Sequence, residues 1–359
     1  MENAVRPDYE GACLSNVVSA LLGSRVDEWL PEPVRGARAV VLLVMDGLGW
    51  DVLDERAPTM RAMQGGPITT VVPSSTTAAL TSLTTGRAPT EHGITGIVVR
   101  TEGVSLHTLR WRAGPQQPVP DPARVQTVAP FGGRAIPVVT RAEFDGSGFT
   151  EAHLRGARFV PWYTVSSLAI NVLSLIRGGE PFVYAYYEGV DSVSHVYGTN
   201  SPFTDAEIGF SDGIVAWLLD RLPSDVALVV TADHGQVPLD AGSWIDLSPL
   251  STYASAFSGD GRCRYAYAIP GRAADLARAA RDLAGERGWV FERERFLDEG
   301  WVGPATALAM ERVGDVVLLG RDAAFLDPAH AGEKAMRSGH GSVTRSEMLV
   351  PLIAARGRA

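Results

Sequence analysis

Three continuous apolar runs constrain the fold of this chain more than any other feature. They span residues 39–45, 182–187 and 226–231. Each run is too short for a buried helix of usual length and fits a β-strand buried on both faces of a parallel sheet. Apolar residues at helical spacing predict helices at residues 14–22 and 165–176. Together these features predict an α/β fold with a mostly parallel central sheet and helices on both faces.

Each predicted strand is followed by a residue that can bind a metal ion or act as a nucleophile. The candidates, together with a histidine near the end of the chain, are Asp46, Thr76, Asp191, His195, Asp233, His234 and His340. Ligands of α/β proteins bind at the carboxyl ends of parallel strands, so we expect these side chains to gather at one edge of the sheet. Asp191 and His195 are four residues apart and on a helix would point the same way. The alternative for an aspartate such as Asp46 is that it only caps the next helix.

The stretch from Pro73 to Gly86 places several hydroxyl groups where a short strand at residues 68–72 ends and a helix begins. The unpaired N–H groups at a helix start attract an anion such as phosphate, so one of these hydroxyls is a candidate nucleophile. Ser and Thr are also the preferred N-cap residues and need no chemistry there. The carboxylates and histidines elsewhere in the chain favour the nucleophile.

The three candidate aspartates predict bound cations. Carboxylates that lie close together repel one another and become protonated unless positive charge neutralises them. Two divalent ions carry four positive charges, which balance three carboxylates and one deprotonated hydroxyl. Nitrogen and oxygen ligands without a thiolate suit Zn²⁺ best and Mn²⁺ less well. We therefore predict two divalent metal ions, with zinc as the preferred metal.

An inserted segment is expected between Asp233 and His340. Residues 261–334 show the pattern strand, long helix, strand, strand, and a last apolar strand follows at residues 348–354. We predict a core of residues 1–260 and 335–359 and an inserted α+β cap subdomain of residues 261–334. Residues 100–160 are rich in Pro and Gly and predict a loop-dominated excursion with short strands.

Composition limits the partners and the location. The 32 basic and 41 acidic residues give a net charge of −9, which argues against binding a nucleic-acid duplex. Cys13 and Cys263 are the only cysteines, so neither a disulfide framework nor a cysteine-based zinc site is expected. We find no signal-peptide pattern and no apolar run of membrane-spanning length, and we expect a cytoplasmic protein that does not bind membranes.

Five motifs occur in an order that resembles one known family. They are Val44-Met-Asp-Gly-Leu48, Pro73-Ser-Ser-Thr76 with Thr85-Gly86 and Glu91-His-Gly-Ile94, Gly189-Val-Asp-Ser-Val-Ser-His195, Thr231-Ala-Asp-His-Gly235 and Gly339-His-Gly341. The motifs cover almost the whole chain. In this order they resemble the alkaline phosphatase superfamily, in its nucleotide pyrophosphatase/phosphodiesterase branch.

The resemblance implies an alkaline-phosphatase-like fold and a two-metal phosphohydrolase that cleaves phosphodiester or nucleotide pyrophosphate bonds of small molecules. It implies one ion on Asp191, His195 and His340, and a second ion on Asp46, Thr76, Asp233 and His234. Spacing to Thr85-Gly86 selects Thr76 as nucleophile over Ser75 and Thr77, with a phosphothreonine intermediate. Family phosphodiesterases commonly carry Phe-Pro-Asn after the nucleophile and an asparagine after His-Gly-Ile, where this chain has Thr77-Ala-Ala79 and Thr95-Gly-Ile97.

Two other functions use the same residues. A phosphomonoesterase or phosphonate hydrolase of this superfamily would share every metal ligand, and a non-catalytic binding module would share the scaffold. A monoester dianion rewards a positively charged clamp such as a bidentate arginine. The sequence offers only Arg87, at the far end of the helix that Thr76 begins, and Arg337, just before His340. We therefore expect phosphodiesters or nucleotide pyrophosphates as substrates.

Overall fold

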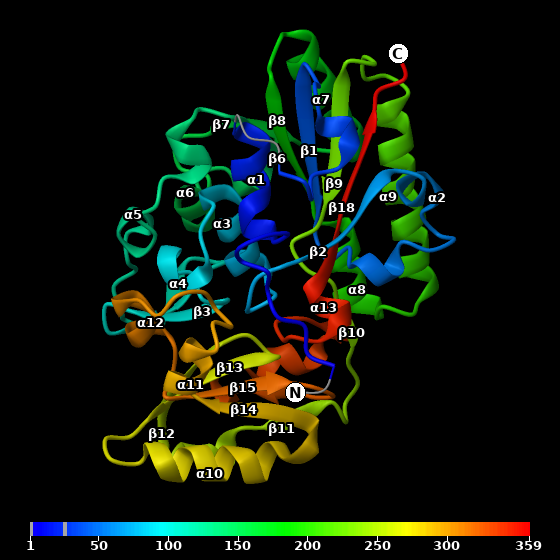
Figure 1. Cartoon of the computed structure of the whole chain (residues 1–359). Coiled ribbons are helices and arrows are strands. Elements are labelled where there is room, and N and C mark those ends of the chain that lie inside the picture. The colour runs from blue at the N-terminus through cyan, green and yellow to red at the C-terminus, as the bar shows by residue number, and fades with distance from the viewer. Residues whose placement is uncertain (1–2, 24–26) are drawn as a thin grey trace.

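The central sheet of the computed structural model, which describes residues 3–23 and 27–359, has the strand order β2-β18-β9-β1-β8-β6-β7 (Figure 1). Its strands are β1 (Ala39–Met45), β2 (Gln64–Thr69), β6 (Pro137–Arg141), β7 (Arg158–Trp162), β8 (Phe182–Tyr187), β9 (Val226–Thr231) and β18 (Leu349–Arg356). β1 pairs in parallel with both β8 and β9, whereas β18 runs antiparallel to β9 and β2. β2 therefore points in the same direction as β9, and the predicted mostly parallel sheet is confirmed.

The central strands are buried on both faces, as their unbroken apolar sequences predict. Every residue of β1, β8 and β9 is buried. The helices of this layer are α1 (Leu14–Leu22), α2 (Pro58–Arg61), α3 (Thr76–Thr85), α6 (Gly148–His153), α7 (Val165–Arg177), α8 (Gly189–Tyr197) and α9 (Pro202–Leu219). Figure 1 shows α1 and α3 on one side of β1 and β9 and α9 on the other. No helix in the described ranges has both the length and the apolar character needed to cross a membrane.

The strand expected at residues 68–72 is displaced in the structure. β2 covers Gln64–Thr69 and pairs only with β18, so it lies at the edge of the sheet. Its sequence contains Gly65, Gly66 and Pro67, which weaken the strand pattern, and a proline that cannot donate to the ladder is tolerated at an edge. Residues 70–72 follow the strand and lead the chain across the carboxyl edge of the sheet to α3.

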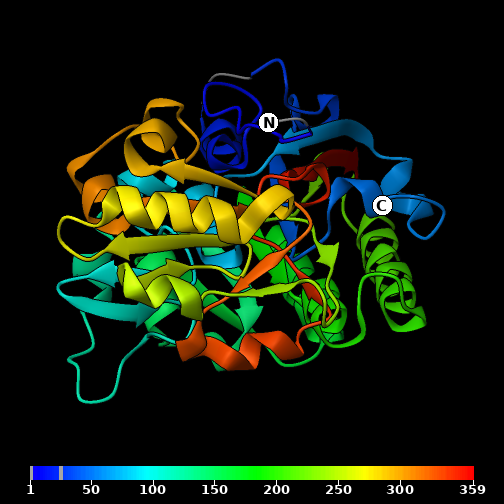
Figure 2. The same ribbon diagram turned by 90° about the horizontal axis from the view of Figure 1, so that it is seen from below.

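A second sheet, with the strand order β14-β15-β13-β12-β3-β4-β5, lies below the first in Figure 1 and toward the viewer in Figure 2. Its strands are β3 (Val98–Thr101), β4 (Val104–His107), β5 (Arg112–Ala113), β12 (Ala254–Gly259), β13 (Cys263–Ala268), β14 (Gly288–Glu292) and β15 (Val316–Gly320). The expected strand, helix, strand, strand pattern is present, with α10 (Ala273–Ala284) packed on β14 and β15. The sheet also includes β12 and β3–β5, which lie outside residues 261–334. The assignment of residues 261–334 to a subdomain of their own stays a prediction.

Shorter elements complete the chain. The remaining helices are α4 (Pro89–His92), α5 (Pro122–Val125), α11 (Arg293–Asp298), α12 (Ala307–Arg312) and α13 (Arg345–Met348). Two small ladders pair β10 (Val237–Pro238) with β17 (Ser338–Gly339) and β11 (Trp244–Asp246) with β16 (Ala324–Leu326). The β10·β17 ladder brings the segment that contains His340 beside the end of β9.

A buried ion pair joins the two sheets. Arg262, just before β13, donates two hydrogen bonds of 2.7 and 2.9 Å to the carboxylate of Glu347, in the short helix that leads into β18. Arg262 is 1% exposed and Glu347 is fully buried. Bidentate geometry in a buried site makes this contact sensitive to the loss of either partner.

Replacing Glu347 with alanine should lower the free energy of unfolding by about 3–5 kcal/mol, because it leaves the guanidinium of Arg262 buried without its counter-charge. Chemical denaturation would measure the change. The control is Glu292→Ala, which removes the half-exposed partner of Arg281 and should change stability much less. Equal effects of the two substitutions would contradict the structural role assigned to the buried pair.

Candidate active site

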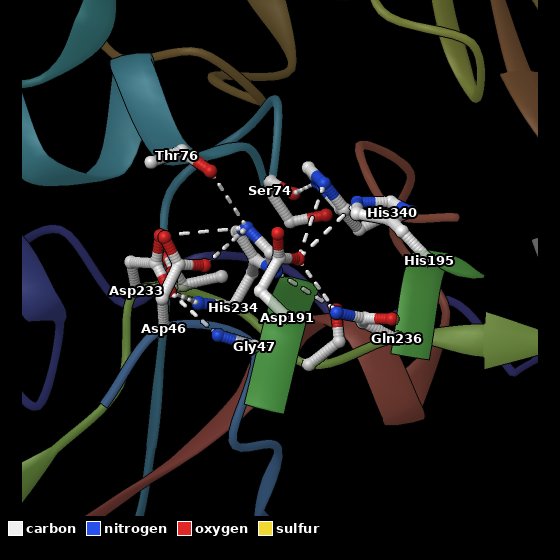
Figure 3. Close-up of polar contacts among 12 residues, drawn as sticks. Asp46, Gly47, Ser74, Thr76, Asp191, His195, Asp233, His234, Gln236 and His340 are labelled. Atoms are coloured by element: carbon white, nitrogen blue, oxygen red, sulfur yellow. Dashed lines mark hydrogen bonds and ion pairs between the residues drawn. The ribbon is translucent and has the colours of Figure 1, made fainter. Parts of the chain in front are cut away.

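The predicted metal and nucleophile residues lie together at the carboxyl edge of the central sheet (Figure 3). Asp46 follows β1, Asp233 and His234 follow β9, and Asp191 and His195 lie on α8 after β8. Thr76 is the first residue of α3, and His340 follows β17. The structure therefore brings together every residue that the strand-end pattern selected, from segments far apart in the sequence.

Three of these residues, Thr76, Asp46 and Asp233, surround the imidazole of His234. Its Nε2 atom lies 3.2 Å from Thr76 Oγ1, 3.5 Å from Asp46 Oδ1 and 3.4 Å from Asp233 Oδ2. The other oxygen of Asp233 accepts hydrogen bonds from the backbone N–H groups of Gly47 and His234, and the other oxygen of Asp46 accepts one from the Tyr186 hydroxyl. Each carboxylate is thus held by one oxygen and directs the second toward Thr76 and His234.

The other residues surround the carboxylate of Asp191. Its Oδ1 atom lies 3.2 Å from His195 Nε2 and 3.9 Å from His340 Nε2. The amide of Gln236 donates a 2.6 Å hydrogen bond to the same oxygen, and Gln236 in turn accepts one from the Ser338 hydroxyl. The rings of His340 and His234 stack with centroids 3.6 Å apart, so the two groups are directly adjacent.

The tautomer of all three histidines is set by backbone carbonyls. The Nδ1 atoms of His195, His234 and His340 lie 3.0–3.1 Å from the carbonyl oxygens of Ser338, Gly235 and Ser74. A carbonyl oxygen can only accept, so each Nδ1 carries a proton and donates it. In the neutral rings the lone pair is then on Nε2, which faces the carboxylates, and this is the arrangement of a metal-binding histidine.

Burial opposes negative charge at the cluster. It raises the pKa of Asp46 well above its usual range, and the carboxylates of Asp233 and Asp191 raise it further. Burial likewise raises the pKa of Asp233. Burial also lowers the pKa of His340 well below its usual range, which keeps that ring neutral. The raised pKa values of Asp46 and Asp233 favour their protonated forms unless a cation is bound beside them.

The side chains fit divalent cations. Asp46 Oδ1 and Asp233 Oδ2 are buried and have no hydrogen-bond partner among the described residues. Two sets of possible ligand atoms lie within 4.8 Å of one another, Asp46 with Asp233 and His234, and Asp191 with His234 and His340. His234 belongs to both sets by distance, so its assignment to the ion of Asp46 and Asp233 stays a prediction.

Among the three neighbouring hydroxyls, Thr76 alone lines a cavity that reaches the cluster. This cavity of about 600 Å³, here called the Thr76 cavity, is also lined by Asp46 and Asp191. Thr76 is 7% exposed, whereas Ser75 and Thr77 are fully buried. The geometry thus favours Thr76 over its neighbours as a group that a substrate could reach.

The sequence model of the type I phosphodiesterase / nucleotide pyrophosphatase family matches residues 40–342. The chain belongs to this family. It is therefore a hydrolase of the phosphodiesterase and nucleotide pyrophosphatase class. A comparison with curated protein sequences finds no match.

Solved structures show the same fold. Murine ectonucleotide pyrophosphatase/phosphodiesterase 5 superposes with a TM-score of 0.70 at 16% identity, covering 89% of this chain and 88% of that protein. An inactive threonine-to-alanine variant of the murine protein, in complex with AMP, gives 0.68 at 15% identity over 88% of this chain and 87% of that one. Phosphonoacetate hydrolase from Sinorhizobium meliloti, in complex with phosphonoformate, gives 0.62 at 21% identity over 90% of this chain and 91% of that one.

Sequence reasoning missed two arginines in this phosphodiesterase. Arg110, on the turn between β4 and β5, and Arg112, the first residue of β5, line the Thr76 cavity. Arg87 is paired with Glu91, and neither it nor Arg337 lines this cavity. The expectation that Arg87 and Arg337 are the only arginines near the nucleophile was therefore wrong, because the segment of Arg110 and Arg112 reaches the site only through the strand pairing of the second sheet.

Proposed function

We propose that this member of the family hydrolyses phosphodiester or nucleotide pyrophosphate bonds of small molecules through a covalent intermediate on Thr76. The observation that carries the proposal is the position of Thr76 Oγ1, 3.2 Å from His234 Nε2 and beside the unpaired oxygens of Asp46 and Asp233. The backbone N–H groups at the start of α3 favour an anionic phosphoryl group at the same place.

The proposed reaction has two displacements. Thr76 Oγ forms a bond to phosphorus while the bond from phosphorus to the leaving oxygen breaks. Water then cleaves the phosphothreonine and restores the hydroxyl. Two bound divalent ions would lower the pKa of the nucleophilic hydroxyl and stabilise the charge on the leaving oxygen. The Gly47 and His234 N–H groups, Tyr186 and Gln236 hold the carboxylates in place.

We propose zinc as the metal, with Asp191, His195 and His340 holding one ion and Asp46, Thr76, Asp233 and His234 holding the other. The support is the chemistry of the donors: three imidazoles with their Nε2 lone pairs facing the cluster, three carboxylates and no thiolate. The proposal includes a cytoplasmic location. It is supported by Cys13 and Cys263, which are both buried and unpaired, as in proteins of reducing compartments.

The Thr76 cavity favours a diester over a monoester. Its wall includes apolar and aromatic side chains, among them Leu80, Phe144 and Phe149, on which a second substituent of the phosphate can rest. A phosphomonoester has no second substituent that could contact this wall. The fold shared with a phosphonate hydrolase keeps phosphonates as the alternative substrate class.

We expect a higher kcat/KM for a p-nitrophenyl nucleotide diester than for p-nitrophenyl phosphate, measured at equal zinc occupancy. The two esters release the same product, so the comparison isolates the contribution of the substituent. A monoester advantage of about tenfold, roughly 1.4 kcal/mol of transition-state discrimination, would support the phosphatase instead.

A further inference from the structure

Arg110 and Arg112 are charged groups of the Thr76 cavity that form no ion pair with any described residue. Among the side chains that the structure describes, neither guanidinium lies within 4.0 Å of a carboxylate oxygen. The two glutamates of the same cavity differ in this respect. Glu188 and Glu143 are paired with Arg141 at 2.7 and 3.1 Å. The cavity therefore offers two available positive charges, while its glutamates are already engaged.

The segment that carries the two arginines is held in place by Trp111, which lies between them in the sequence. Trp111 is 8% exposed and adopts a left-handed backbone conformation with φ of 49°. Its indole N–H donates a 2.8 Å hydrogen bond to the carbonyl of Pro120, and its ring packs against Gly148, where a Cβ atom would come within 2.1 Å. A bulky residue keeps this conformation only where the surroundings hold it. Arg110 and Arg112 remain exposed on either side of this anchor.

The arginines lie outside the reacting centre. They line the same cavity as Thr76, Asp46 and Asp191, yet neither guanidinium comes within ion-pair distance of those carboxylates. Arg110 also lines a second cavity of about 420 Å³, which contains His195 and His340. A phosphoryl group bound at Thr76 would thus share its cavity with both guanidinium groups, which are not ion-paired with the carboxylates there.

We propose that Arg110 and Arg112 form an anion subsite that binds a second negatively charged group on the substituent of the reacting phosphorus. Guanidinium groups recognise phosphate and carboxylate oxygens through paired, charge-assisted hydrogen bonds. The substrate class is therefore phosphodiesters whose retained substituent carries a further phosphate or carboxylate, over diesters with neutral substituents. This inference rests on the proposed function, because it assumes that phosphorus binds at Thr76.

The test compares two diesters with the same leaving group, ethyl p-nitrophenyl phosphate and 2-carboxyethyl p-nitrophenyl phosphate, on the zinc-loaded protein. We expect kcat/KM to favour the charged ester by about tenfold or more, as for a hydrogen bond between charged groups. The double variant Arg110→Gln/Arg112→Gln should lose most of this preference. Arg110→Lys/Arg112→Lys should keep part of it, because the charge remains while the paired geometry is lost.

Arg177→Gln provides the matched control, because Arg177 ends α7 and lines neither cavity. It should leave the preference unchanged. A second readout is binding of the two product monoesters, ethyl phosphate and 2-carboxyethyl phosphate, by calorimetry. If wild type hydrolyses both diesters and the glutamine variant keeps the preference, the subsite is disproved and the proposed function stands. If neither diester is hydrolysed but the variant loses its binding preference, the subsite stands and the proposed function fails.

Discussion

Replacing Thr76 with alanine should lower kcat/KM for a p-nitrophenyl nucleotide diester by roughly 10³-fold or more, about 4 kcal/mol of transition-state stabilisation. Alanine has no oxygen to bond phosphorus, so only direct attack by water remains. The fold should persist, because the side chain of Thr76 makes one hydrogen bond, to His234, among the described residues. Losing it should reduce stability by about 1 kcal/mol. Metal content and thermal unfolding of the variant would confirm that only the nucleophile is lost.

The neighbouring hydroxyls provide matched controls for this substitution. Ser75 and Thr77 are fully buried, and their hydroxyls have no hydrogen-bond partner among the described residues. Neither residue lines the Thr76 cavity. Ser75→Ala and Thr77→Ala should therefore retain most of the activity. If Ser75→Ala or Thr77→Ala is inactive while Thr76→Ala is active, the assignment of the nucleophile to Thr76 is wrong.

The sequence predicts the cluster well because the direction of a strand determines at which edge of the sheet its carboxyl end lies. Asp46 and Asp233 each follow an apolar run that is buried on both faces, so their position at the carboxyl edge required no knowledge of side-chain packing. Thr76 follows for the same reason, since β2 runs in the direction of β9 although it lies at the sheet edge and begins four residues earlier than expected.

Contacts that depend on strand pairing could not be predicted from one sequence. β3 joins the second sheet by pairing with β12 at Gly259 and Val98, which are far apart in the chain. This pairing carries β4, β5 and the turn with Arg110 to the site. No local pattern in the Pro- and Gly-rich excursion indicates such a partner, because hydrophobic periodicity reports which face of a strand is buried and not which strand covers its edge.

The sequence analysis also missed the residues that hydrogen-bond to the proposed metal ligands. For one of them, the register between β1 and β8 gives a signal. Tyr186 in β8 lies opposite Val44 of β1, two residues before Asp46, and its hydroxyl reaches the Asp46 carboxylate. Gln236 follows the Asp-His motif by two residues and reaches Asp191 on a different element. Its contact depends on how α8 lies beside the segment that follows β9, which is a tertiary property.

The protein should purify with close to two zinc ions per chain and should lose its activity when a chelator removes them. The charge of the site leads to this expectation: three carboxylates are gathered where burial raises the pKa of Asp46 and Asp233. Without ions, the raised pKa values of Asp46 and Asp233 favour their protonated forms in the folded protein. Elemental analysis of the purified protein, with activity measured before and after chelation, tests this. A fully active protein without metal would contradict it.

Asp233→Asn separates the charge of this ligand from its shape. An asparagine can keep the hydrogen bonds from the Gly47 and His234 N–H groups on its carbonyl oxygen, while its amide replaces Oδ2, which faces His234 Nε2 at 3.4 Å. We expect a folded protein that has lost one ion and roughly 10³-fold or more of its kcat/KM, about 4 kcal/mol. The matched control is Asp212→Asn, a buried aspartate that accepts hydrogen bonds from the N–H groups of Thr59 and Met60 away from the cluster. Asp212→Asn should lower the melting temperature but keep both ions. If Asp233→Asn retains both ions and full activity, Asp233 is not a metal ligand.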